Sequence, residues 1–167
     1  MSVRDEPQRD PARVIAALRE QAFTIVPSTV GVSPEPGHQR AWAVIMETGY
    51  DAAVVSLVTI ADGTTSLYFS NGGGIFGAGR HDAVRAASAR FIQVADSRVG
   101  DLPEVVEHPL PAVGRVCLYV RTFQGLHGFE ARGADLGNGR GSVQAELFRA
   151  GHDVISAVRE ATPPTKN

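Results

Sequence analysis

The chain has 167 residues, of which 43% are hydrophobic and 20% are charged. This length and composition are enough to bury a core without disulfide staples, so we expect one globular domain over residues 1–167. The formal net charge of −2 gives no general electrostatic reason to bind nucleic acid or an anionic membrane, and we expect neither as a partner.

The single cysteine, Cys117, rules out an intramolecular disulfide and any metal site that needs several cysteines. The first residues contain no apolar signal-peptide core, and no later run approaches the ~18 apolar residues of a membrane span. We therefore expect a cytoplasmic protein. Its ends, 1–9 and 162–167, are expected to be flexible.

The first element in chain order is a helix over 11–22. Asp10-Pro11 is typical of a helix start, because Asp caps free N–H groups and Pro fits the first helical position. The apolar face follows at helical spacing, with Val14, Ile15, Leu18 and Ala22. The run 27–37 then holds three prolines and two glycines, which predicts a long loop.

Three strands come next, over 41–47, 52–60 and 64–70. The first places Trp42, Val44 and Met46 on one face by simple alternation, and both of its faces are apolar. Asp62-Gly63 predicts a tight hairpin between the second and third strands. The three strands therefore form an antiparallel meander.

The second half of the chain repeats helix and strand patterns. Apolar residues from Val84 to Ala95 recur at spacings of three and four residues. This spacing predicts a helix over 82–97 that is capped by Asp82 or His81. A strand over 115–123 and a short strand over 129–132 follow. Ser142 then caps a last helix, whose apolar stripe includes Leu147, Val154 and Ile155.

The order α-β-β-β-α-β-β-α predicts an α+β fold in which helices pack on a mostly antiparallel sheet of about five strands. The first two strands are apolar on both sides, and two arrangements explain this. Helices cover both faces of the sheet, or another subunit covers part of one face. The second arrangement predicts a homodimer.

The stretch Asn71–Arg80 joins the clearest strand to the clearest helix, and five of its ten residues are glycine: Gly72, Gly73, Gly74, Gly77 and Gly79. It satisfies Gly-x-Gly-x-x-Gly, but a dinucleotide site needs a parallel β-α-β unit and an acid after the next strand. Two antiparallel hairpins precede this loop, and Asp96 belongs to the same helix. The phosphate-loop pattern also fails, because Arg80-His81 follow the last glycine. We expect no cofactor.

A weaker anion site is compatible with the same residues. A second glycine-rich stretch, 133–141, also leads into a helix and carries Arg140. If both helix starts lie at one edge of the sheet, Arg80 and Arg140 could hold one carboxylate or phosphate, with His81 and His127 beside them. The alternative is that each glycine run only turns the chain.

The sequence has no signature of other site chemistry. None of the five histidines lies two or four residues from another, so we expect no metal site. No Gly-x-Ser-x-Gly elbow is present, and Cys117 lies within a strand instead of at a helix start that would favour a thiolate.

Two hypotheses follow, and the sequence leaves open whether the protein is an enzyme. The first is a non-catalytic binding or oligomerisation module that uses a sheet face and the glycine-rich loop 71–80. The second is a small enzyme that acts on an anionic small molecule at the loops 71–81 and 133–142. Convergence of Arg80, His81, His127 and Arg140 in one pocket would favour the enzyme.

Overall fold

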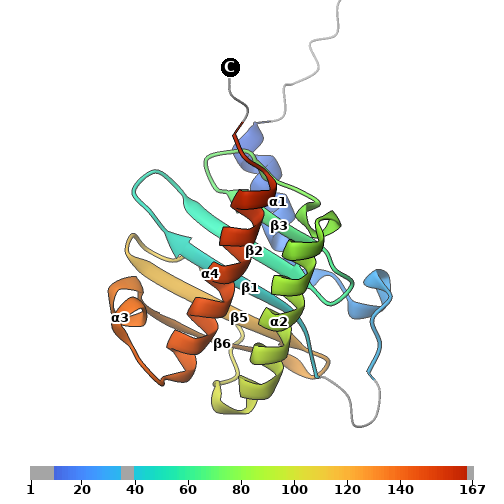
Figure 1. The fold of residues 1–167 in the computed structure, drawn as a ribbon, viewed down its shortest axis with the longest axis vertical. Coiled ribbons are helices and arrows are strands. Elements are labelled where there is room, and N and C mark those ends of the chain that lie inside the picture. The colour runs from blue at the N-terminus through green and yellow to red at the C-terminus, as the bar shows by residue number, and fades with distance from the viewer. Residues whose placement is uncertain (1–9, 35–39, 165–167) are drawn as a thin grey trace, which may run out of the picture.

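The computed structural model describes residues 10–34 and 40–164. It shows a six-stranded antiparallel sheet in the order β4-β3-β2-β1-β5-β6, with helices on both sides (Figure 1). The strands are β1 (Ala41–Gly49), β2 (Val54–Ile60), β3 (Thr65–Phe69), β4 (Gly74–Ile75), β5 (Arg115–Thr122) and β6 (Gly125–Arg132). This arrangement confirms the α+β class, with six strands where about five were expected.

The helices are α1 (Pro11–Thr24), α2 (Asp82–Arg98), α3 (Gly133–Asn138) and α4 (Val143–Ala161). Short 3-10 helices lie at η1 (Pro27–Val30), η2 (Ala78–Arg80) and η3 (Val99–Asp101). The part of the expected loop at 35–39 and the terminal residues 1–9 and 165–167 lie outside the described residues.

Helices α2 and α4 lie side by side on one face of the sheet (Figure 1). They bury a core with Val44, Leu57 and Leu118 from the strands. The close approach of α4 depends on Gly151, because a Cβ there would lie 2.6 Å from Met46 Sδ and 3.2 Å from Phe91 Cζ. The apolar stripe that the sequence predicts for the last helix lies in this core.

Helix α1 covers the opposite face, behind the sheet in Figure 1. The segment 102–113 joins it there, since Tyr119 Oη donates to the Pro109 carbonyl at 3.3 Å. Arg121 Nη1 donates to the carbonyls of Ala22 and Ile25, at 3.0 and 2.7 Å, and so fixes the C-terminal end of α1. Both faces of β1 and β2 are thus covered within the chain, which explains their apolar character.

Simple alternation along β1 places Trp42 on the wrong face. The register shifts between Ala41 and Ala43, so a bulge interrupts the alternation. Trp42 therefore packs beside Ala43 and Ile45 on the α1 side, while Val44 and Met46 face α2 and α4.

The expected helix caps form at α1 and α4. Asp10 Oδ1 and Ser142 Oγ each accept a hydrogen bond at 3.1 Å, from the N–H groups of Ala12 and Ala145. His81 precedes α2, but its side chain makes no capping hydrogen bond. At the Asp62-Gly63 hairpin only Gly63 has a positive φ, of 96°.

Candidate functional site

The glycine-rich stretch forms the edge of the sheet. After β3 the chain turns back, with Phe69 N–H donating to the Gly73 carbonyl at 3.1 Å. Gly74 and Ile75 then pair with Tyr68 and Leu67 as β4, the strand that the sequence did not predict. The chain continues through η2 into α2.

Three of the five glycines in this stretch are required by contacts within the chain. A Cβ at Gly79 would overlap the Gly63 carbonyl oxygen, and a Cβ at Gly74 would overlap the Leu67 carbonyl oxygen. Gly72 has a φ of 114°, and its Cβ would lie 2.8 Å from Pro11 Cβ in α1. Gly73 and Gly77 have positive φ but open space around them, so a turn accounts for both.

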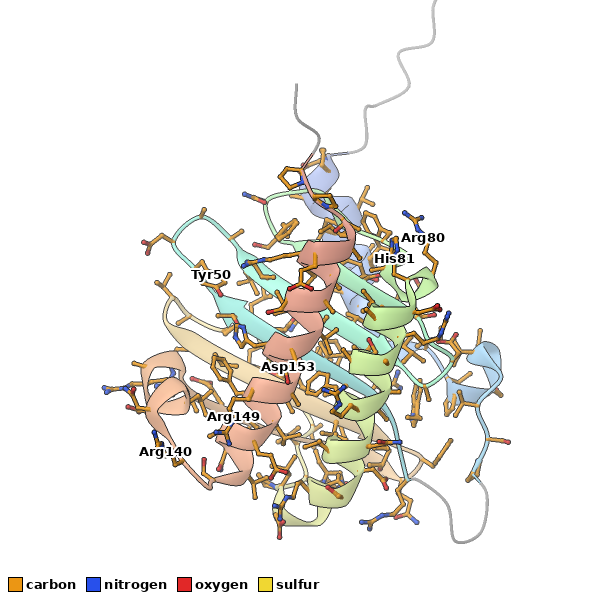
Figure 2. All side chains as sticks on the ribbon, viewed as in Figure 1. Tyr50, Arg80, His81, Arg140, Arg149 and Asp153 are labelled. Carbon is orange, nitrogen blue, oxygen red and sulfur yellow. The ribbon has the colours of Figure 1, made fainter. Side chains whose placement is uncertain are left out.

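Arg80 and His81 lie at the start of α2 (Figure 2). The Arg80 side chain is exposed and makes no hydrogen bond or ion pair with the described residues. His81 is partly buried, and its Nε2 has no partner in the described part of the chain. Arg80 is therefore available to a ligand.

A hollow of about 290 Å³ lies beside this stretch. One wall is the turn between β2 and β3, with Asp62, Gly63 and Thr64, and the other contains Gly77, Gly79 and the two arginines Arg80 and Arg85. The glycines leave backbone where side chains would otherwise fill the space.

The charges around this hollow are mixed. Arg85 Nη1 donates to the Gly79 carbonyl at 3.1 Å, and its Nη2 pairs with Asp82. Asp62 Oδ1 accepts the Thr64 N–H at 2.8 Å. Because Asp82 balances Arg85, Arg80 is the cation that can meet an anionic group, with Asp62 opposing it from the turn.

The other predicted residues do not join this group. Figure 2 shows Arg140 at the loop between α3 and α4, well separated from Arg80 and His81. His127 lies on β6, at the opposite edge of the sheet from β4, with its Nδ1 3.2 Å from the Leu102 carbonyl oxygen. Most of the second glycine-rich stretch forms α3 and is not the expected loop. The two stretches lie at separate places, and the four side chains do not form one pocket.

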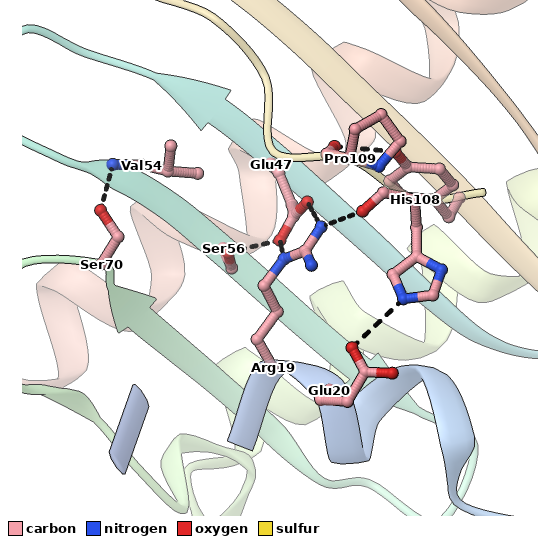
Figure 3. Close-up of polar contacts among 9 residues, drawn as sticks. Arg19, Glu20, Glu47, Val54, Ser56, Ser70, His108 and Pro109 are labelled. Carbon is pink, nitrogen blue, oxygen red and sulfur yellow. Dashed lines mark hydrogen bonds and ion pairs between the residues drawn. The ribbon is translucent and has the colours of Figure 1, made fainter. Parts of the chain in front are cut away.

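A buried polar cluster on the α1 side was not predicted (Figure 3). Glu47 is fully buried and accepts two hydrogen bonds from Arg19, at 2.7 and 2.8 Å, and one from Ser56 Oγ at 2.7 Å. Arg19 Nη2 also donates to the His108 carbonyl. Arg19 and Glu47 are 28 residues apart in the sequence, so no local pattern reveals the pair.

The acid–base properties of this cluster favour a structural role. Burial by itself would lower the pKa of Arg19, but the hydrogen bond and charge of Glu47 outweigh burial and raise that pKa. Cys117 on β5 pairs with Glu47 and so lies beside this cluster, and burial raises the pKa of its thiol. A buried thiol with a raised pKa is a poor nucleophile, so the cluster joins α1 to the sheet and offers no reactive group.

The described residues contain no group of three or more His, Cys, Asp and Glu side chains arranged to hold a metal ion. None of the helices in that part of the chain combines the length and apolar character needed to cross a membrane.

Comparison of the chain with protein-family models, with curated proteins and with solved structures found no match.

Proposed function

We propose that the protein is a non-catalytic binding module that holds a small anion, a carboxylate or a phosphate, in the hollow beside the glycine-rich loop. The observation that carries this proposal is the position of Arg80, an exposed arginine with no partner among the described residues, on the wall of that hollow. Guanidinium groups bind carboxylates and phosphates through paired, charge-assisted hydrogen bonds.

Two features support a binding module over an enzyme. His127 and Arg140 lie away from Arg80, so the two arginines do not hold one anion together, and of the two predicted histidines His81 alone lies near Arg80. Thr64 and Arg85 also line the hollow, and both carry groups that can donate hydrogen bonds to an anion. Helices and the segment 102–113 cover the sheet faces, so the glycine-rich loop is the surface left to bind a ligand.

Anion-dependent thermal stability tests the proposal. A ligand that binds only the folded state stabilises it, by about 1.4 kcal/mol at a tenfold excess over its Kd. For a chain of this size that corresponds to a rise in Tm of about 3–6 °C. We expect acetate, sulfate or phosphate to raise Tm above a chloride series of matched ionic strength.

Arg80→Ala should abolish this shift and leave the Tm in chloride nearly unchanged. The control is Arg149→Ala, an exposed arginine of α4 that lies well away from Arg80 in Figure 2. If wild type shows no shift beyond chloride, or if both variants respond alike, the anion site is wrong and the glycine-rich stretch is only a turn.

A further inference from the structure

A second hollow of about 210 Å³ adjoins the hollow beside the glycine-rich loop. Asp62, Gly63 and Arg85 line both, so the two meet around the turn between β2 and β3. The second hollow runs along α2, where Ser88, Ala89 and Ile92 face the end of β2.

The second hollow has a mixed lining, in which the apolar side chains of Ile60, Ala89 and Ile92 lie beside the polar side chains of Asp62, Ser88 and Gln93. Ile60 is 8% exposed and Ile92 is 3% exposed, so their side chains present a fixed hydrocarbon surface. The Ser88 hydroxyl also lines the hollow, but it already shares a hydrogen bond of 2.7 Å with Thr65 Oγ1. A short apolar tail there would gain by burying the apolar part of this lining.

The charges at the other end favour a head group with one negative charge. Of the two arginines that line this hollow, Arg80 has no partner among the described residues, and Arg85 is paired with Asp82. Asp62 lies beside both hollows and repels a second negative charge. These groups suit a carboxylate better than a phosphate dianion.

We infer that the ligand is an amphipathic monocarboxylate, with its carboxylate at Arg80 and a short apolar tail over Ile60 and Ile92. This inference rests on the proposed anion site and adds the tail. Small-molecule sites usually have volumes of about 300–1,000 Å³, with largely apolar walls and few polar groups that fix orientation. The two adjoining hollows, of about 290 and 210 Å³, would hold the carboxylate and the tail respectively.

A series of unbranched carboxylates tests the tail. The Kd values of acetate, butyrate, hexanoate and octanoate for the full chain are measured by titration calorimetry at pH 7.5 and constant ionic strength. Each methylene that enters the second hollow should strengthen binding about fourfold, until the hollow is full. Hexan-1-ol, which has the tail without the charge, should bind at least tenfold more weakly than hexanoate.

Two matched variants test whether the tail binds in the second hollow. Ala89 is exposed and lines the second hollow, so Ala89→Phe should remove the dependence on chain length and leave acetate binding unchanged. Ala86 is exposed on the same helix and lines neither hollow, so Ala86→Phe should behave as wild type. Circular dichroism checks that both variants fold.

The outcomes separate this inference from the proposed function. If acetate binds and Arg80→Ala abolishes its binding, but the Kd is the same from acetate to octanoate, the second hollow does not bind a tail. The anion site then stands. A chain-length dependence that survives in Ala89→Phe also overturns the inference. If no carboxylate binds, or if hexan-1-ol matches hexanoate, both the inference and the anion site fail.

Discussion

Arg19 and Glu47 make a two-point ion pair, with Nε–Oε1 and Nη2–Oε2 distances of 2.7 and 2.8 Å, that joins α1 to β1 in the middle of the sheet (Figure 3). Glu47 is fully buried, and the charged Arg19 side chain is 15% exposed. A buried pair contributes little net stability as a unit, but the loss of one partner leaves a charge stranded in a medium that solvates it poorly.

Arg19→Met should therefore lower the free energy of unfolding by about 3–5 kcal/mol, measured by urea denaturation at pH 7. Arg13→Met is the control, because Arg13 is exposed on the same helix and its side chain has no ion pair among the described residues. The control should stay within about 0.5 kcal/mol of wild type. Equal losses in the two variants would show that the pair does not hold α1.

Leu147 on α4 is fully buried in the core between α4 and the sheet. Leu147→Ala should cost about 2–5 kcal/mol of unfolding free energy, because it removes buried hydrocarbon and leaves a cavity. Gln144→Ala, at an exposed position on the same helix, is the control. A loss under ~0.5 kcal/mol at Leu147, small for a core truncation, would mean that α4 is peripheral.

Alanine substitution should distinguish the glycines that packing requires from those that only the backbone angle requires. At Gly73, with φ at 84° and open space, alanine should cost about 1–2 kcal/mol from backbone strain. Gly79→Ala should cost more, because its Cβ meets the Gly63 carbonyl and pushes the hairpin away. Gly100, with neither restriction, should tolerate alanine. If chemical denaturation gives Gly79→Ala and Gly100→Ala the same loss of unfolding free energy, the packing of η2 on the hairpin is contradicted.

His152 on α4 should make stability depend on pH. Burial and the charge of Arg159 lower its pKa in the folded state, while Asp153 acts in the opposite direction. A lowered folded pKa means that the unfolded chain binds the proton more tightly. The contribution of neutral His152 to the free energy of unfolding is therefore complete above the ordinary histidine pKa of about 6.5. It is lost as the pH falls through the lowered pKa of the folded state. His152→Gln should flatten the fall in urea midpoint between pH 7.5 and 5, and an unchanged slope would exclude this role.

Self-association remains a prediction, now motivated by a different surface. The segment 102–113 covers the sheet but exposes Val106, Leu110 and Val113, of which Val106 is 91% exposed. We expect a homodimer that buries these side chains, with Val106→Asp/Leu110→Asp converting it to a monomer. Light scattering of wild type that gives the monomer mass at high micromolar concentration would end this idea.

Local patterns predicted most of the fold because most elements have a clear period or cap. The starts of α1 and α4 could be predicted from Asp10 and Ser142, whose side chains form the expected capping hydrogen bonds. Strand β4 has two residues, Gly74 and Ile75, which is too short for any period. The bulge at Ala41–Ala43 is likewise a feature of pairing with β5, which the sequence of β1 does not encode by itself.

The candidate site was less accessible to sequence reasoning because it depends on strand order. Arg80 follows the glycines in sequence, so its place beside the loop could be predicted. Arg140 and His127 would join it only if β6 lay near β4, and these two strands are at opposite edges. Arg85 lies one helical turn beyond Asp82 and reads as an ordinary surface ion pair, so its position between the two hollows was missed.

The bulge in β1 also gives the protein a built-in optical reporter. Trp42 is the single tryptophan of the chain, and the bulge places it, 1% exposed, on the α1 side. The Arg121 guanidinium lies 4.3 Å from the centre of its ring and donates to the last carbonyls of α1. Intrinsic fluorescence excited at the indole band therefore reports the docking of α1, independently of the core that α2 and α4 form on the other face.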